Sequence, residues 1–194
     1  MLKVGITGGI GSGKSMVGKI LEALGYPVFY SDDQAKSLSD TDPDIRKDLI
    51  QLFGSEVYNQ NGLNRRFLAE KIFGDESHRQ RVNQIIHPRV RQAFVEFCNN
   101  QTSEIVFNEA AILIETGAHK NFDAMVLVTA PEDVRILRVQ QRDQSDAESI
   151  KQRMQKQWTD DQKRPHADFE IINDGEKPLL KQVEELVESL ASSV

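Results

Sequence analysis

Residues 5–15 read Gly-Ile-Thr-Gly-Gly-Ile-Gly-Ser-Gly-Lys-Ser, and within them residues 8–15 match the pattern G-x-x-x-x-G-K-[ST] in full. The apolar run from Leu2 to Thr7 precedes this motif and is typical of a short buried strand. Apolar residues follow it at helical spacing, namely Val17, Ile20, Leu21 and Leu24. Strand, glycine-rich turn and helix in this order predict a loop that binds the phosphates of a nucleotide.

The residue types of this loop suit an anionic ligand. Glycines let the backbone turn tightly, so that successive N–H groups face an anion, and the helix that starts there adds its positive end. Lys14 supplies a point charge for the β- and γ-phosphates, and Ser15 supplies a hydroxyl ligand for Mg²⁺. We expect ATP and Mg²⁺ as ligands, with phosphate contacts from Gly9, Ile10, Gly11, Ser12, Gly13, Lys14 and Ser15.

Short apolar runs alternate with helical patterns along much of the remaining chain. Further strands are expected at residues 28–30, 104–108, 123–129 and 168–172. Together with the phosphate loop, this alternation predicts an α/β protein with a three-layer α/β/α P-loop fold around a five-stranded parallel sheet. Ligands of such sheets bind at the carboxyl ends of the strands, so the loops that follow them are expected to hold the chemistry.

Residues 55–100 depart from this alternation and predict a helical substrate-binding insertion. The core would then comprise residues 1–54, 101–134 and 167–194. Within residues 65–91, seven Lys or Arg stand against three acids, which favours an acidic second substrate, with ordinary surface basicity as the alternative. Pro88 predicts a kink or a helix restart. His87 is either a phosphate or hydroxyl partner or a structural residue tied to that kink.

Residues 135–166 predict a mobile helical lid. They hold eight Lys or Arg against five Asp or Glu, a local excess of cations in a chain of net charge −6. Arg138 and Arg142 are four residues apart and therefore share a helix face. Cations on a lid stabilise a transferring phosphoryl group while the lid excludes water. The alternative is a solvated helix face with scattered charges.

Asp32 directly follows the second predicted strand and is the candidate general base. A carboxylate there accepts the proton of an attacking hydroxyl or orients a water bound to Mg²⁺. The alternative is an N-cap of a helix that begins near Gln34, a role that Asp33 fits equally well. The third strand ends in Asn108-Glu109 without an aspartate, so the metal is held by Glu109, or by Ser15 with phosphates and water.

Length and composition limit the remaining function classes. A chain of 194 residues fits one domain, and a net charge of −6 argues against a general nucleic-acid binder. Cys98 is the single cysteine, so an internal disulfide is excluded and a reducing cytoplasm is expected. The sequence holds no apolar run near the roughly 20 residues that span a bilayer. A monomer is expected, although the sequence leaves the oligomeric state open.

An ordered set of motifs resembles the dephospho-CoA kinase family over nearly the whole chain. Thr7-Gly8-Gly9 is more particular to that family than the general phosphate-loop pattern. Two positions depart from its pattern: Tyr30 replaces the first acid of a D-x-D-like stretch, and Ala111 stands where a proline is usual. The other matching segments are Leu24-Gly25 with Val28 and Asp32, Arg66 to Phe73, Asn83 to Pro88, Ile112 to Glu115, Arg138, Arg142-Asp143, Arg153, Gln157, Ala167-Asp168 and Asn173-Asp174-Gly175.

The resemblance implies phosphorylation of the ribose 3′-hydroxyl of dephospho-CoA by ATP, the final step of coenzyme A biosynthesis. It implies catalysis by Asp32, Lys14 and Arg142. It also implies ATP contacts from Arg138, Arg142, Asn173 and Gly175, and acceptor contacts from Asp32, Arg66, His87 and Glu115.

Two other functions stay open from the residues alone. A nucleoside monophosphate kinase would share the architecture but read an acceptor phosphate with arginines. A regulatory ATP-binding module would lack catalysis, and Asp32 with the lid pattern argues against it. A GTPase is excluded because the guanine-reading Asn-Lys-x-Asp segment is missing.

Overall fold

The computed structural model describes residues 1–192 and divides the chain into two compact units. One unit comprises residues 1–30 together with those from 101 onward, and the other comprises residues 31–100. The helical unit therefore begins at Ser31, earlier than the predicted insertion of residues 55–100. The last two residues of the predicted core segment 167–194 lie outside the described part of the chain.

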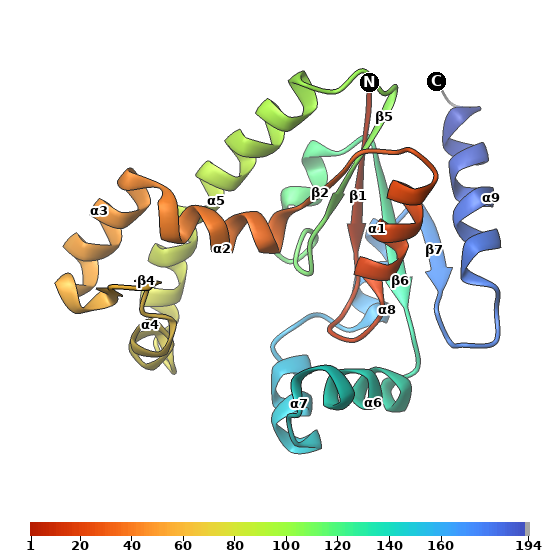
Figure 1. The fold of residues 1–194 in the computed structure, drawn as a ribbon. Coiled ribbons are helices and arrows are strands. Elements are labelled where there is room, and N and C mark those ends of the chain that lie inside the picture. Colours follow the sequence, from red (N-terminus) through yellow and green to blue (C-terminus); the bar gives the residue numbers. More distant parts are fainter. Residues whose placement is uncertain (193–194) are drawn as a thin grey trace. The chain divides into compact units, whose positions relative to one another are not determined.

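A five-stranded parallel sheet forms the first unit and confirms the predicted fold class (Figure 1). Its strands stand in the order β2-β5-β1-β6-β7, so the strand that carries the phosphate loop lies at the centre. Each observed strand agrees with its predicted range to within one residue. The strands are β1 (Leu2–Thr7), β2 (Val28–Tyr30), β5 (Ile105–Glu109), β6 (Ala124–Thr129) and β7 (Phe169–Ile172).

Helices and turns cover both faces of this sheet. Because side chains alternate along a strand, Val126 and Val128 face the helices α1 and α9, whereas Met125 faces the opposite side with Leu113 and Ile114. The unit also contains the elements that form the predicted lid. The helices and 3₁₀ turns of this unit are α1 (Lys14–Ala23), η2 (Ala118–Asn121), α6 (Glu132–Asp143), α7 (Ala147–Met154), α8 (Asp160–Lys163), η3 (Arg164–His166) and α9 (Leu179–Ala191).

The second unit is helical and has a core of its own. Its helices carry apolar residues at helical spacing, so that each helix turns one apolar face inward. The residues buried together there include Ile45, Leu49, Val57, Leu68 and Val82. A short antiparallel ribbon within it was not expected from the sequence. The elements are α2 (Ser31–Thr41), α3 (Pro43–Phe53), η1 (Ser55–Val57), β3 (Tyr58–Asn59), β4 (Gly62–Leu63), α4 (Arg65–Ile72) and α5 (Glu76–Asn99).

Two local expectations in this unit are corrected. Of the two alternatives at Pro88, the restart is excluded, because α5 continues through this residue as one element. Helix α2 begins at Ser31, not near Gln34. Asp32 and Asp33 therefore lie in its first turn and do not act as N-caps, although their charges still suit the positive end of the helix.

Candidate active site

The phosphate loop joins the end of β1 to the start of α1. Gly13 precedes the helix with a φ of 96°, a left-handed conformation that favours glycine, and Lys14 is the first helical residue. The Ser12 N–H donates to the Gly9 carbonyl over 3.1 Å, which closes the turn. The structure thus places Lys14 and Ser15 in the first helical turn, where the predicted phosphate and metal contacts belong.

Glu109 lies beside the lysine of this loop. The Lys14 Nζ is 3.7 Å from the Glu109 Oε1, and both side chains are largely buried. Glu109 is the last residue of β5, and its register partner on β1 is Ile6, so sheet pairing brings it to the loop. Glu109, one of the alternatives that the sequence offers for holding the metal, therefore lies beside the lysine of the phosphate loop.

Arg138 and Asn173 form a chain of hydrogen bonds to the loop. The Arg138 guanidinium donates to the Asn173 carbonyl over 3.0 Å and to the Asn173 Oδ1 over 3.2 Å. The Asn173 Nδ2 then donates to the Ser12 carbonyl over 3.0 Å. Two residues predicted to contact ATP, from α6 and from the end of β7, are thus brought to the phosphate loop. Gly175 follows in the same loop, with a φ of 92°.

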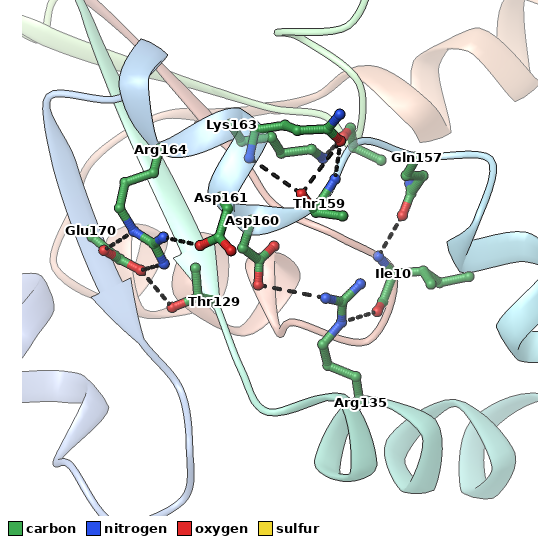
Figure 2. A network of polar contacts seen from close by, with 12 residues as sticks. Ile10, Thr129, Arg135, Gln157, Thr159, Asp160, Asp161, Lys163, Arg164 and Glu170 are labelled. Carbon is green, nitrogen blue, oxygen red and sulfur yellow. Dashed lines mark hydrogen bonds and ion pairs between the residues drawn. The ribbon is translucent and has the colours of Figure 1, made fainter.

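The predicted lid segment also reaches the loop at Ile10 (Figure 2). The Ile10 N–H donates to the Gln157 Oε1 over 2.8 Å, and the Arg135 Nε donates to the Ile10 carbonyl over 2.9 Å. Because the Ile10 N–H is already engaged by Gln157, this group is not available for the predicted contact of Ile10 with phosphate. A Cβ on Gly9 would lie 2.0 Å from the Arg135 guanidinium, so a larger residue here would displace that side chain.

Arg142 lies apart from these contacts, on a solvent-exposed part of the lid segment. Its guanidinium binds Asp143 through Nε over 2.7 Å and Nη2 over 3.1 Å, and Arg153 binds the same carboxylate. The hydrogen bonds from Arg142, followed by those from Arg153, lower the pKa of Asp143 from 3.8 to about 2.

A depressed pKa makes the contribution of Asp143 to stability depend on pH. The stabilisation is present above pH 4 and is lost as the pH falls through about 2, because the folded state resists protonation of this carboxyl. We expect Asp143→Asn to lower the melting temperature at pH 5–7. The difference in melting temperature between the variant and the parent should become smaller as the pH falls toward 2. Calorimetry of both proteins across this range checks this, and a difference that does not change with pH would contradict it.

Glu115 is held by a buried ion pair in the segment after β5. The Lys163 Nζ lies 2.9 Å from the Glu115 Oε1, and the Lys163 side chain is 0% exposed. The same Nζ donates to the Ala111 carbonyl over 3.2 Å, an oxygen that also accepts from the Thr7 hydroxyl. Among the residues that the structure describes, the buried Glu115 Oε2 has no hydrogen-bond partner.

The other acceptor-side candidates lie in the helical unit. Asp32 is exposed in the first turn of α2, and its charge raises the pKa of His87 on α5. Burial is the larger effect and lowers the pKa of His87, with Arg91 adding to it, so the imidazole is neutral near pH 7. Arg66 lies on the outer face of α4, where its side chain is 91% exposed and pairs with Glu70.

Sequence reasoning missed Arg135, Asp160 and Lys163 as parts of this site. Arg135 was counted only as a charge of the lid, although it lies one helical turn before Arg138, which is the signal that could have identified it. Lys163 carried no such signal, because charged side chains are seldom buried and their sequence spacing does not reveal a partner 48 residues away.

The family model and the curated relatives that match this chain carry the same description. A family model described as dephospho-CoA kinase matches residues 2–178. A dephospho-CoA kinase of Bacteroides fragilis is 44% identical, over 100% of this chain and 95% of that protein. A dephospho-CoA kinase of Porphyromonas gingivalis is 39% identical, over 98% of this chain and 95% of that protein.

Solved structures agree with the fold. A Thermus thermophilus protein superposes with a TM-score of 0.86 at 30% identity, over 100% of this chain and 97% of that one. A dephospho-CoA kinase from Campylobacter jejuni gives a TM-score of 0.67 at 22% identity, over 98% of each chain. A shikimate kinase from Acinetobacter baumannii gives 0.57 at 14% identity, over 100% of this chain and 94% of the other. The last two likenesses concern the fold alone. Within residues 1–192, none of the helices is long and apolar enough to span a membrane.

Proposed function

Because this chain belongs to the dephospho-CoA kinase family, kinases that use ATP in the final step of coenzyme A biosynthesis, we propose that Asp32, Lys14 and Arg142 carry the transfer. The acceptor is the ribose 3′-hydroxyl of dephospho-CoA. The observation that supports the binding of ATP beside Lys14 most directly is that Lys14, Glu109, Arg138 and Asn173 gather at the phosphate loop.

On the donor side, the loop and its neighbours bind ATP. Gly9, Ile10, Gly11, Ser12 and Gly13 surround the phosphates, and Lys14 places its charge on the β- and γ-phosphates. Arg138, held by Asn173, adds a second cation, and Gly175 lies in the loop that follows. Arg142 would exchange Asp143 for the transferring phosphoryl group, because it is exposed on the lid segment.

The residues at the loop also suit Mg²⁺. The Ser15 hydroxyl and the Glu109 carboxylate are oxygen donors of the kind this ion prefers, and Asp32 remains an alternative carboxylate. The ion would neutralise charge that develops on the phosphate oxygens.

On the acceptor side, Asp32 accepts the proton of the 3′-hydroxyl as its oxygen attacks the γ-phosphorus. A new O–P bond forms, the bond from the γ-phosphorus to the bridging oxygen breaks, and ADP leaves with the electron pair. His87 is neutral and can therefore hydrogen-bond the acceptor without a charge of its own. Arg66 would attract a phosphate of the acceptor, and the Glu115 carboxylate, whose side chain is 12% exposed, would accept from one of its hydroxyl groups.

An ADP-release assay over several acceptors tests this function. We expect release that depends on dephospho-CoA and gives coenzyme A in equal amount, whereas nucleoside monophosphates should give little. Release with a nucleoside monophosphate alone would favour the other kinase class, and ATP binding without any release would favour a regulatory module.

We further propose a cytoplasmic monomer. The support for the compartment is that the sequence holds a single cysteine, Cys98, which is buried. Gel filtration with light scattering checks the mass, because a dimer would double the value of 22.0 kDa.

A further inference from the structure

We propose that Arg135 and Gln157 are positioning residues, which hold the two peptide groups on either side of Ile10 and thereby prearrange the phosphate loop for ATP. This inference rests on the proposed function in one respect, namely that the loop binds the phosphates of ATP. Neither residue needs to touch the nucleotide for this role.

The two contacts fix successive peptide planes. The Ile10 N–H belongs to the peptide shared with Gly9 and donates to Gln157 over 2.8 Å. The Ile10 carbonyl belongs to the peptide shared with Gly11 and accepts from Arg135 over 2.9 Å (Figure 2). A peptide group is planar and turns as one body, so a hydrogen bond to either of its polar atoms sets the orientation of the whole plane.

The sequence around Ile10 makes such a restraint necessary. Ile10 stands between two glycines, and glycine has more backbone freedom to lose on ordering than any other residue. An unrestrained Gly-Ile-Gly stretch would sample orientations in which the following amides do not face the phosphates. Contacts that already hold the bound arrangement lower the entropy lost when ATP binds, and the affinity for ATP rises accordingly.

Arg135 is itself held in place. Its side chain is 11% exposed, and its Nη1 lies 3.5 Å from the Asp160 Oδ2. Its Nη2 packs so closely on Gly9 that a Cβ there would lie 2.0 Å away. Partial burial strengthens a hydrogen bond from a charged donor to a carbonyl, because little water competes for either group.

The holding residues come from three parts of the predicted lid segment. Arg135 lies on α6, Gln157 lies between α7 and α8, and Asp160 is the first residue of α8. Ile10, by contrast, belongs to the loop between β1 and α1. Displacement of the lid segment would therefore release the phosphate loop, so ATP affinity depends on the position of the lid segment.

The test compares Arg135→Met and Gln157→Met in the full chain with matched controls. Methionine keeps much of the side-chain volume but removes the donor or the acceptor. The controls are Gln141→Met on the exposed side of α6 and Gln155→Met, also exposed. Calorimetric titration with Mg-ATP gives Kd without any acceptor, and steady-state kinetics give kcat and both KM values. Thermal melting reports on folding.

We expect each of the two variants to raise Kd and KM for ATP about tenfold, the scale of one lost hydrogen bond. The kcat and the KM for dephospho-CoA should stay within about threefold of the parent, and both controls should match it.

An unchanged Kd in both methionine variants would overturn the proposal. The proposal would also be overturned if Kd for ATP, kcat and both KM values worsened by the same factor while the melting temperature fell, because this pattern indicates a merely structural role. Failure of the proposed function would give a different result. The parent would release no ADP with dephospho-CoA, but the Kd for ATP would still be higher in Arg135→Met than in the parent.

Discussion

Replacing Asp32 by alanine is expected to lower phosphoryl transfer to dephospho-CoA by two or more orders of magnitude while ATP binding persists. The reason is that a general base contributes on the order of 10²–10⁴-fold to a rate, and it acts on the acceptor hydroxyl, not on the nucleotide. The loss should therefore appear in kcat, with Kd for ATP within about threefold of the parent.

Asp33→Ala is the matched control. Asp33 lies in the same exposed helical turn and pairs with Lys36 at the surface, so its removal should change the rate little. Coupled ADP-release assays and titration with Mg-ATP measure the two effects separately. A rate for Asp32→Ala close to that of Asp33→Ala would eliminate Asp32 as the base.

His87 provides a second readout of the same substitution. The Asp32 charge raises the pKa of His87 against the stronger lowering by burial. Removal of the Asp32 carboxylate should therefore lower the pKa of His87 further, and proton NMR titration can follow this change. A pKa that does not change would show that the two side chains do not interact in solution.

The second large effect is expected for Lys163→Met, at about 3–5 kcal/mol of unfolding free energy. The substitution leaves Glu115 largely buried without the ammonium that lies 2.9 Å from its Oε1. It also removes the hydrogen bond from Lys163 to the Ala111 carbonyl. A buried charge without a partner is far more costly than a missing surface contact.

Urea unfolding checks this prediction against Lys181→Met. Lys181 pairs with Glu185 over 3.8 Å at an exposed site, where such pairs contribute about 0–1 kcal/mol. The double variant Lys163→Met with Glu115→Gln should recover a large part of the loss, because it removes both charges. Equal costs for Lys163→Met and Lys181→Met would refute a stabilising role for the buried pair.

The phosphate loop and the strands around it could be predicted because their signals are local. Residues 8–15 require a tight turn and a helix start, and short apolar runs specify buried strands within one residue of their observed limits. Helix α3 likewise follows from Pro43 at its start and Gly54 at its end. Local signals misplaced the start of α2, which lies at Ser31 and not near Gln34, and of the kink or restart expected at Pro88 the restart is absent from α5.

The partners of the candidate site residues could not be predicted in the same way. Arg138 was placed on the lid from its spacing to Arg142, yet only the structure shows it bound to Asn173, 35 residues away. Arg142 shares its helix but binds Asp143 instead. Side-chain pairing across elements depends on strand order and helix rotation, and a single sequence records neither.

By itself, the sequence determined that a glycine-rich loop joins a strand to a helix, because backbone geometry at that loop depends only on neighbouring residues, and it predicted that this loop binds phosphate. The tertiary structure decided which charges would be buried and paired, as with Lys163 and Glu115, and that Arg135 and Gln157 would hold Ile10. These contacts join residues more than 40 positions apart, and only the packed sheet and its loops bring them together.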